Sequence, residues 1–438
     1  MNYFGTDGIR QEAVKFTPDF LTKTIKGLIN YAGDEIKILL GGDTRESTEW
    51  ILTDLESACE TFGIEYGNVS ILPTPAINYC FYNMGFDFAI DVTASHNPYQ
   101  DNGIKIFERG QNSGQKLCDA GREAIELALS SAENYPSASS TLRENLHDKV
   151  LNLYKKHLIN YVENANFAGL NIGVDCANGA TSVIAKQVFE HFGAHTYIIN
   201  ANASYNTKIN AKCGSTHLES LQNLVAKKHL DFGVAFDGDG DRCLMVDNDG
   251  KVIDGDHILA ILTDYLNLEK ISTTVMANQG LLNWLKDREI NTEITAVGDH
   301  NVAEAMRKYN ISLGGEQSGH IILPGETTGD GTLTALMVSK IISESNKPLS
   351  KIANIITKFP QIIVNLSATP EQKQIFKEND SVKKTLLDYN SKLTEVEGRL
   401  LVRPSGTEPL IRITMWGNNE NIISQLANEL KTKLGEIL

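Results

Sequence analysis

The chain has 438 residues, of which 41% are hydrophobic and 22% are charged, and these fractions are typical of globular proteins. Its formal net charge of −15 argues against nucleic acid as a partner, because nucleic-acid phosphates attract basic surfaces. At roughly 100–200 residues per domain, a chain of this length predicts three or four domains.

The spacing of the cysteines and the lack of targeting or membrane-spanning segments predict a soluble, cytoplasmic protein. The six cysteines are widely spaced, without a Cys-x-x-Cys pair, so neither a disulfide framework nor a zinc site is indicated. The N-terminus lacks the basic start and apolar core of a signal peptide, and there is no run of about 18 apolar residues. We therefore expect no secretion and no membrane partner.

The first predicted domain covers residues 1–145 and alternates strands with helices. An apolar run at 36–40 predicts a strand, Pro73 marks the start of a helix, and another helix is predicted at 114–129. The domain ends in a connector at 130–141, which is rich in Ser and lacks an apolar period. This alternation is typical of an α/β domain.

Ser95 lies between two predicted strands of this domain, at 86–92 and 104–107. The dipeptides Asn97-Pro98 and Asn102-Gly103 predict turns, so we expect Ser95 on a tight, exposed loop with hydrogen-bond donors beside it. An ordinary polar turn has a similar composition and is the alternative interpretation.

Three aspartates mark a glycine-rich loop in the second predicted α/β domain, which covers 146–250. Asp237, Asp239 and Asp241 follow an apolar strand, and the intervening glycines let the backbone bend so that the carboxylates face one point. A hard divalent cation would relieve their repulsion, and oxygen ligands favour Mg²⁺ or Ca²⁺. An EF-hand is excluded, because it needs glycine where Arg242 stands. A solvated acidic turn is the alternative.

The third predicted α/β domain covers 251–366 and contains a polar loop. Glu316, Ser318 and His320 alternate along it, so in an extended conformation their side chains could share one face. Glutamate and serine suit sugar hydroxyls as binding partners. His320 could bind substrate, act as a base or be structural.

The last segment, 367–438, predicts a smaller α+β domain, with strands at 398–416 followed by an amphipathic helix. Apolar residues recur at every fourth position of that helix: Ile422, Leu426, Leu430 and Leu434.

A phosphate-binding cradle is predicted at the strands of this last domain. Its residues are Arg403, Ser405, Gly406, Thr407 and Arg412. Two guanidinium groups can bind a phosphate in bidentate fashion, two hydroxyls add donors, and the glycine lets backbone N–H groups approach. The combination indicates a site for a dianion.

Four of these stretches together resemble, in the same order, the signature loops of the α-D-phosphohexomutase family. They are the Ser95 loop and the loops at 237–242, 314–320 and 403–412. The opening Phe4-Gly-Thr-Asp-Gly-Ile-Arg10 and the Glu316-Gln-Ser318 segment are most similar to the phosphoglucosamine mutase branch. The resemblance implies three similar α/β domains with mixed sheets and a smaller C-terminal α+β domain, around a central cleft.

The family also implies a phosphoserine and a Mg²⁺ site. Ser95 would carry the phosphate, and the metal ligands would be a phosphoryl oxygen on Ser95 with Asp237, Asp239 and Asp241. Arg242 would lie close to the same phosphate.

Lys105 is the candidate general acid or base, because it lies in the strand just after the Ser95 loop and a lysine among other cations can titrate low. A surface lysine is the alternative. His96 and Arg10 are expected to hold the phosphoserine rather than to move protons.

The implied reaction interconverts glucosamine 6-phosphate and glucosamine 1-phosphate through phospho-Ser95, with glucosamine 1,6-bisphosphate as intermediate and activator. It would supply UDP-N-acetylglucosamine and cell-wall precursor synthesis. The partner would be a small hexosamine phosphate, and a homodimer is compatible with the sequence.

Three alternatives stay open: a phosphomannomutase/phosphoglucomutase of the same family, a phosphohydrolase, and a non-catalytic sugar-phosphate sensor. The cradle disfavours a hydrolase, which needs no site for a second phosphate, and the intact serine and aspartates disfavour a sensor. The segment at 296–301 has Ala and His where the family commonly has a basic residue and Arg-Tyr, which leaves the sugar less defined than the reaction. Motifs for ATP or NAD are absent from the sequence.

Overall fold

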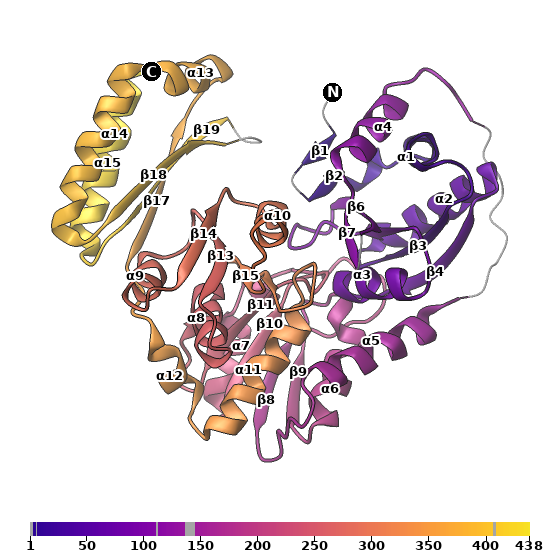
Figure 1. Cartoon of the computed structure of the whole chain (residues 1–438), viewed down its shortest axis with the longest axis horizontal. Helices are drawn as coiled ribbons and strands as arrows, with labels where there is room; N and C mark the ends of the chain where they lie inside the picture. Colours follow the sequence, from indigo (N-terminus) through magenta and orange to yellow (C-terminus); the bar gives the residue numbers. More distant parts are fainter. Residues whose placement is uncertain (1–2, 6, 111–112, 136–144, 406–408) are drawn as a thin grey trace. The chain divides into compact units, whose positions relative to one another are not determined.

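The computed structural model describes residues 3–5, 7–110, 113–135, 145–405 and 409–438 (Figure 1). The chain divides into two compact units. Unit 1 consists of Met1–Thr274 and Thr292–Ile355, and unit 2 of Val275–Asn291 and Ile356–Leu438. In the part of the chain that is described, no helix is long and apolar enough to cross a membrane.

The first sheet of unit 1 is mixed and has the order β1-β2-β6-β5-β3-β4, with β7 paired to β6. β3 is parallel to β4 and β5, whereas β6 is antiparallel to β2, β5 and β7. The strands are β1 (Phe4–Gly5), β2 (Gly8–Glu12), β3 (Lys37–Gly42), β4 (Glu65–Ile71), β5 (Phe88–Val92), β6 (Asp101–Arg109) and β7 (Gly114–Lys116). The helices are α1 (Pro18–Ala32), α2 (Glu46–Phe62), α3 (Thr74–Asn83) and α4 (Asp119–Leu129).

Both local sequence signals and pairing between strands that are distant in the sequence determine the secondary structure of this region. α1 begins after Thr17, whose side chain accepts a hydrogen bond from Phe20 N–H. Two sequence predictions are wrong. Asn102-Gly103 lies inside β6, because β2 pairs with β6 there, and residues 114–116 form a strand before α4, because they pair with β6. In both places, pairing with a strand elsewhere in the chain overrides the local preference.

The second sheet is also mixed, in the order β12-β11-β10-β8-β9. Its strands are β8 (Asn171–Asp175), β9 (His195–Ile199), β10 (Phe232–Phe236), β11 (Cys243–Asp247) and β12 (Val252–Ile253), and its helices are α5 (His147–Tyr161), α6 (Ala185–His191) and α7 (Glu219–Lys228). β10 is buried along its whole length and forms an antiparallel hairpin with β11. The loop of that hairpin carries the aspartates.

The third sheet has the order β14-β13-β15-β16. Its strands are β13 (Lys270–Thr274), β14 (Asn291–Thr295), β15 (Gly314–Gly315) and β16 (Ile321–Ile322), and the nearby helices of unit 1 are α8 (Gly255–Tyr265), α10 (Asp299–Tyr309), α11 (Gly331–Ser345) and α12 (Leu349–Ile352). β13 is parallel to β15, and β15 is antiparallel to β16, so a third mixed α/β region follows the first two.

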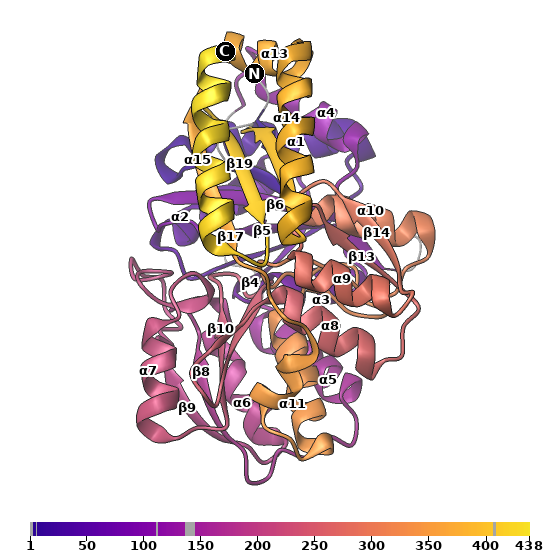
Figure 2. The ribbon, with the colours of Figure 1, turned by 90° about the vertical axis from the view of Figure 1, so that its left-hand side faces the viewer.

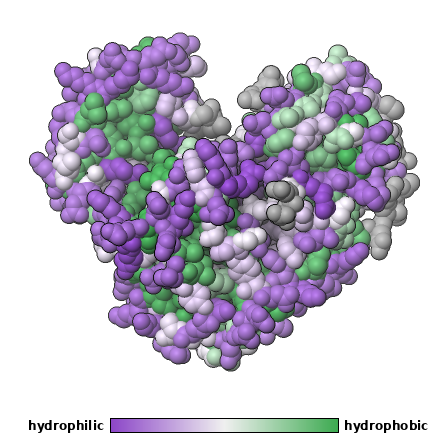
Figure 3. Space-filling view, viewed as in Figure 1, coloured by the Kyte–Doolittle hydropathy of each residue, from purple (hydrophilic) through white to green (hydrophobic). Residues whose placement is uncertain are grey.

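Unit 2 contains an antiparallel sheet of β17 (Gln361–Ser367), β19 (Leu410–Trp416) and β18 (Arg399–Pro404), in that order. Its helices are α9 (Gln279–Asp287), α13 (Pro370–Glu378), α14 (Asp380–Lys392) and α15 (Glu420–Ile437). α14 and α15 lie side by side on one face of the sheet (Figure 2). Hydrophobic residues gather over β17 and β18 on the face seen in Figure 3. The three α/β regions with mixed sheets and the smaller α+β region are confirmed.

Candidate active site

Ser95 lies in the loop that joins β5 to β6. Its φ of 53° is in the left-handed region, which few non-glycine residues adopt. The residue is buried rather than exposed as expected, because the hairpin loop after β10 covers it. A Cβ atom at Gly238 of that loop would lie 2.7 Å from Ser95 O, so the close approach requires glycine. The serine hydroxyl thus faces the aspartates directly.

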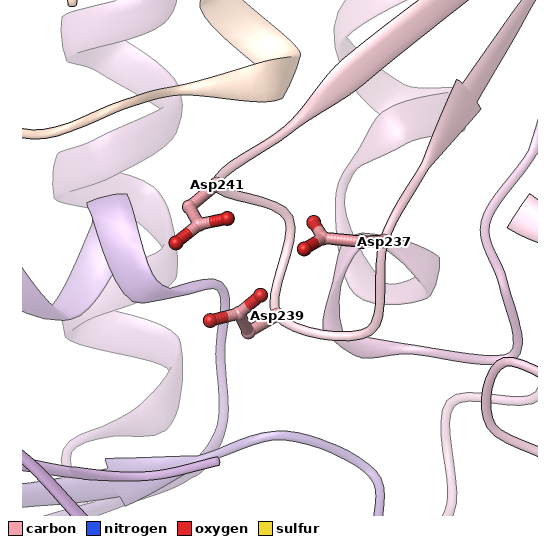
Figure 4. A group of neighbouring side chains, drawn as sticks. All are labelled: Asp237, Asp239 and Asp241. Atoms are coloured by element: carbon pink, nitrogen blue, oxygen red, sulfur yellow. The ribbon is translucent and has the colours of Figure 1, made fainter. Parts of the chain in front are cut away.

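Asp237, Asp239 and Asp241 turn their carboxylates toward one another from this single loop (Figure 4). One ligand atom from each lies within 4.8 Å of the others, and all three residues are buried. Ser95 Oγ donates a hydrogen bond to Asp237 Oδ2 at 2.7 Å. The buried Oδ1 atoms of Asp239 and Asp241 have no hydrogen-bond partner among the described residues, which leaves them available as ligands.

The electrostatics of this cluster fit a hard divalent cation. Burial raises the pKa of Asp237 well above its usual value, and repulsion from Asp239 and Asp241 raises it further. Burial acts on Asp239 in the same direction, but attraction to Lys105 outweighs it and holds the pKa of Asp239 below its usual range. A donor set of carboxylate and hydroxyl oxygens suits Mg²⁺, and a bound cation would relieve the repulsion.

Lys105 provides the cluster with an internal countercharge. Its Nζ lies 2.7 Å from both Asp239 Oδ2 and Asp241 Oδ2 and 3.1 Å from Asp7 Oδ2. Burial lowers the pKa of Lys105, but the three carboxylates outweigh burial and raise the pKa well above its usual value. The expectation that Lys105 titrates low is therefore wrong for this arrangement, because its neighbours are mainly anions.

A chain of alternating charges continues from Lys105. We did not predict it from the sequence. Lys116 Nζ contacts both Asp7 Oδ1 and Asp299 Oδ2. Burial raises the pKa of Asp7, yet Lys105, Lys116 and Arg10 together hold it well below its usual range. Asp7 lies in the opening motif and Asp299 in the segment that departs from the family, but no local signal identifies Lys116. Unit 1 thus links all three of its sheets by ion pairs.

His96 lies next to the Ser95 hydroxyl, Arg242 contacts His96, and Arg10 pairs with Asp7. His96 Nδ1 lies 3.3 Å from Ser95 Oγ and 3.1 Å from Arg242 Nη1. Burial, then Arg242 and Arg10, lower the pKa of His96 to about 4, so the imidazole is neutral near pH 7. Arg10 Nη2 donates to Asp7 Oδ2 at 2.5 Å. The hydroxyl therefore has a neutral imidazole beside it, and that imidazole contacts the guanidinium of Arg242.

Thr74, at the start of α3, also contacts the cluster and was not predicted from the sequence as a site residue. Its Oγ1 lies 2.8 Å from Asp239 Oδ2 and 2.5 Å from Oδ2 of the buried Asp91. The carboxylate of Asp239 is therefore held from two directions, by Thr74 and by Lys105.

The polar loop at 316–320 is a tight turn, not the extended segment expected. Glu316 N–H donates to His320 O, and Gly319, with a φ of 90°, packs against Cys243 O. The expected extended conformation is therefore wrong. Glu316 is buried and its Oε1 accepts from Gly298 N–H at 3.0 Å, whereas Ser318 is half-buried. His320 Nε2 accepts from Gly329 N–H at 3.1 Å, which favours a supporting role.

In unit 2, Arg403 and Arg412 are directly opposite each other in the β18–β19 ladder. Burial lowers the pKa of Arg403, and Arg412 lowers it further. Ser405 N–H donates to Leu410 O, and Ser405 O accepts from Lys373 Nζ at 2.7 Å. Gly406 and Thr407 lie outside the described residues. Two adjacent guanidinium groups form a site suited to a dianion.

Family models for phosphoglucomutase/phosphomannomutase match nearly the whole chain. Domain I matches residues 1–135, domain II residues 152–250, domain III residues 254–359, and the C-terminal domain residues 364–433.

Curated relatives and solved structures agree with this match. The chain is 38% identical to a phosphoglucosamine mutase of Clostridioides difficile, over 100% of this chain and 99% of the relative, and 40% identical to one of Caldicellulosiruptor bescii, over 98% and 97%. In fold it resembles a phosphoglucomutase/phosphomannomutase family protein of Burkholderia thailandensis (TM-score 0.77, 19% identity, 99% and 97% covered). It also resembles Aspergillus fumigatus N-acetylphosphoglucosamine mutase in complex with GlcNAc-6P and magnesium (TM-score 0.69, 16% identity, 100% and 96% covered).

Proposed function

The chain belongs to the phosphoglucomutase/phosphomannomutase family, and from this premise we propose that it interconverts glucosamine 6-phosphate and glucosamine 1-phosphate. It is an isomerase that moves a phosphoryl group within one sugar. The observation that carries the proposal is the buried Ser95 hydroxyl, which faces three converging carboxylates. The names of the curated relatives support glucosamine as the sugar.

The proposed cycle uses Ser95 as a phosphoryl carrier. The bond between phosphorus and Ser95 Oγ breaks as the free hydroxyl of the hexosamine phosphate bonds to phosphorus, and the proton of that hydroxyl passes to Ser95 Oγ. The resulting 1,6-bisphosphate reorients, its other phosphoryl group bonds to Ser95 Oγ, and the proton of Ser95 returns to the sugar oxygen that is released. The three aspartates and a phosphoryl oxygen would hold Mg²⁺, which would supply positive charge to the transferring group, and the complex of the Aspergillus relative with magnesium supports this assignment.

Positively charged side chains of the protein would also stabilise the transferring phosphoryl group. Arg242 and Arg10 would bind oxygens of the phosphoryl group, and the neutral His96 would accept or donate one hydrogen bond without adding charge. Lys105 remains protonated as long as the carboxylates surround it, so its role is to balance charge at the aspartates.

Two further loops would hold the sugar phosphate. We assign Glu316 and Ser318 to the sugar hydroxyls and His320 to the support of their turn. The cradle of Arg403 and Arg412, with the serine, glycine and threonine between them, would hold the phosphate that does not react. Glucosamine 1,6-bisphosphate would prime the enzyme. The free thiols of all six cysteines support a reducing, cytoplasmic location for this reaction.

Mass spectrometry and a substrate panel test the proposal together. After incubation with glucosamine 1,6-bisphosphate, the intact protein should gain one phosphate, which peptide mapping should place on Ser95, and Ser95→Ala should gain none. Among the 6-phosphates of glucosamine, glucose and mannose, glucosamine should give the highest kcat/KM. Protein that is never phosphorylated at Ser95 would refute the phosphoserine cycle, and a preference for mannose or glucose would reassign the sugar.

A further inference from the structure

A buried guanidinium lies beneath the Ser95 loop and belongs to no motif recognised in the sequence. Arg45 follows β3 at the start of α2, and its side chain is completely buried. It donates hydrogen bonds to four backbone carbonyls, three in the loop and one at the start of β6: Ser95 O at 2.7 Å, Asn97 O at 2.9 Å, Pro98 O at 2.5 Å and Asp101 O at 3.1 Å. A single cation thus determines the direction of three carbonyls in the loop that carries Ser95 and connects them to β6.

The same guanidinium is anchored on its other side. Arg45 Nε pairs with Asp43 Oδ2 at 3.0 Å, and this oxygen also accepts a hydrogen bond from Thr93 Oγ1 at 2.6 Å. Thr93 Oγ1 in turn accepts from Ser95 N–H at 2.9 Å. Both the amide and the carbonyl of Ser95 are therefore connected to one buried ion pair.

A second donor reaches the loop from the region of the second sheet. Asn210 Nδ2 donates to Ser95 O at 2.8 Å and to Asn97 O at 3.1 Å. Asn210 is 9% exposed and lies in the segment between β9 and α7. The carbonyl of Ser95 therefore accepts from two donors that belong to different sheets of unit 1.

This double attachment has a direct consequence for the serine. Its left-handed φ of 53° is unfavourable for a residue with a Cβ atom and persists only when the surroundings impose it. Because the peptide is planar and trans, drawing the Ser95 carbonyl toward Arg45 and Asn210 turns the next N–H group, that of His96, to the opposite side. The attachments therefore fix where the hydroxyl lies relative to the aspartates.

We propose that Arg45 and Asn210 are positioning residues that hold Ser95 in place through both phosphoryl transfers. This inference rests on the proposed function, since it assigns a purpose to the geometry of the carrier serine. Neither side chain touches the hydroxyl itself, so each acts through the backbone. Misplacement of a reacting group by about 1 Å can slow a reaction on the order of 10²-fold, so loss of either attachment should slow transfer more than it weakens substrate binding.

Asn210→Gly is the cleaner variant, because glycine tolerates the left-handed φ of 58° at this position and removes only the donors. A matched control is Asn200→Gly. Asn200 lies in the same segment, also has a left-handed φ of 47°, and its Nδ2 donates to Asp175 Oδ2 at 3.1 Å, away from the Ser95 loop and from Arg45. For Asn210→Gly we expect kcat to fall about 10-fold with KM nearly unchanged, while Asn200→Gly keeps wild-type kinetics.

The deciding measurement is the single-turnover rate of phosphoryl transfer from glucosamine 1,6-bisphosphate to Ser95, with thermal midpoints recorded in parallel. Asn210→Gly and Arg45→Lys should both slow transfer, the latter about 10²-fold, because lysine keeps the charge but cannot reach four carbonyls. Equal transfer rates in wild type, Asn210→Gly and Asn200→Gly would overturn the inference, even if Arg45→Lys unfolds. A wild-type protein that accepts no phosphate would instead overturn the proposed function.

Discussion

The phosphoserine centre of unit 1 and the arginine pair of unit 2 would both bind phosphate, but they are built in opposite ways. Around Ser95, the carboxylates of Asp239 and Asp241 already face Lys105, and the groups are almost completely buried. In unit 2, Arg403 and Arg412 lie opposite each other on neighbouring strands, and both are half-buried. Like charges placed directly across a ladder are destabilising.

Under the proposed function, this difference distinguishes the site where the phosphoryl group reacts from the site that only binds the other phosphate. A group that must react needs its surroundings arranged in advance, because reorganisation of charges during transfer would slow the step. A group that only holds a dianion can concentrate positive charge that the ligand neutralises on binding. Variants of the first site should therefore change kcat, and variants of the second should change KM.

The largest expected effect is on the first site. Asp239→Asn should lower kcat about 10²–10³-fold in Mg²⁺. The variant would bind the cation more weakly, and the cation would provide positive charge next to the transferring group. Asp175→Asn is a matched control, since Asp175 is another buried carboxyl in the second sheet but binds only Ala177 N–H, Gly214 N–H and the Asn200 amide. Steady-state kinetics at several Mg²⁺ concentrations measures both. Near-normal turnover of Asp239→Asn would remove the metal assignment.

The next effect concerns the arginine pair. Arg403→Ala and Arg412→Ala should each raise KM and leave kcat less affected, because contacts to the phosphate that does not react are similar in the ground and transition states. A lost charge-assisted hydrogen bond is worth about 1.5–3 kcal/mol, or roughly one to two decades in kcat/KM. Lys392→Ala, the same charge change on the surface of unit 2, should have neither effect. A collapse of kcat at constant KM would show that the pair acts on the reacting phosphate.

The smallest kinetic effect is expected at Asp330, a buried carboxyl of unit 1 that neither site uses. It accepts hydrogen bonds from Tyr154 Oη and Leu333 N–H, and burial raises its pKa to about 7 from 3.8. The native state therefore keeps a proton that the unfolded state releases, so this group contributes stability below about pH 4 that is lost as pH rises toward 7.

Asp330→Asn should remove that dependence. The free energy of unfolding of the variant minus that of wild type should grow by at most about 4 kcal/mol between pH 4 and pH 7 and stay level above, while kcat remains near wild type. Denaturant titrations at four pH values measure the difference. A difference that is constant with pH would mean that the carboxyl is ionised in the native state.

Candidate residues could be found in the sequence where a short segment contains them. The aspartate loop, the serine loop and the arginine cradle each contain their candidate residues within about ten positions, so these motifs could be compared with those of a known family. The ion pairs of Lys116 with Asp7 and Asp299 join residues 109 and 183 positions apart, and Asn210 reaches Ser95 across 115 positions. Such contacts depend on the packing of three sheets, which local patterns do not specify.

Helix α15 shows the same limit on a smaller scale. The predicted stripe at every fourth residue drifts around the helix by about 40° per step, since a turn has 3.6 residues. The buried residues are Ile423, Ala427, Leu430 and Leu434, which stay on one side. The helix and the C-terminal half of its buried face, Leu430 and Leu434, were therefore predicted correctly. At the start of the helix the prediction is wrong, because Ile422 is 40% exposed and Ile423 is buried in its place.

The hydroxyl of Thr74 has one hydrogen, yet it lies within hydrogen-bond distance of oxygens from both Asp91 and Asp239. Both contacts can be hydrogen bonds only if one carboxyl is itself a donor. Burial, the largest influence, raises the pKa of Asp91 well above its usual value, whereas that of Asp239 is lowered. Both contacts are hydrogen bonds when Asp91 is protonated and donates to Thr74, which then donates to Asp239. In that state the three groups would support the aspartate cluster from behind without adding a fourth negative charge to it.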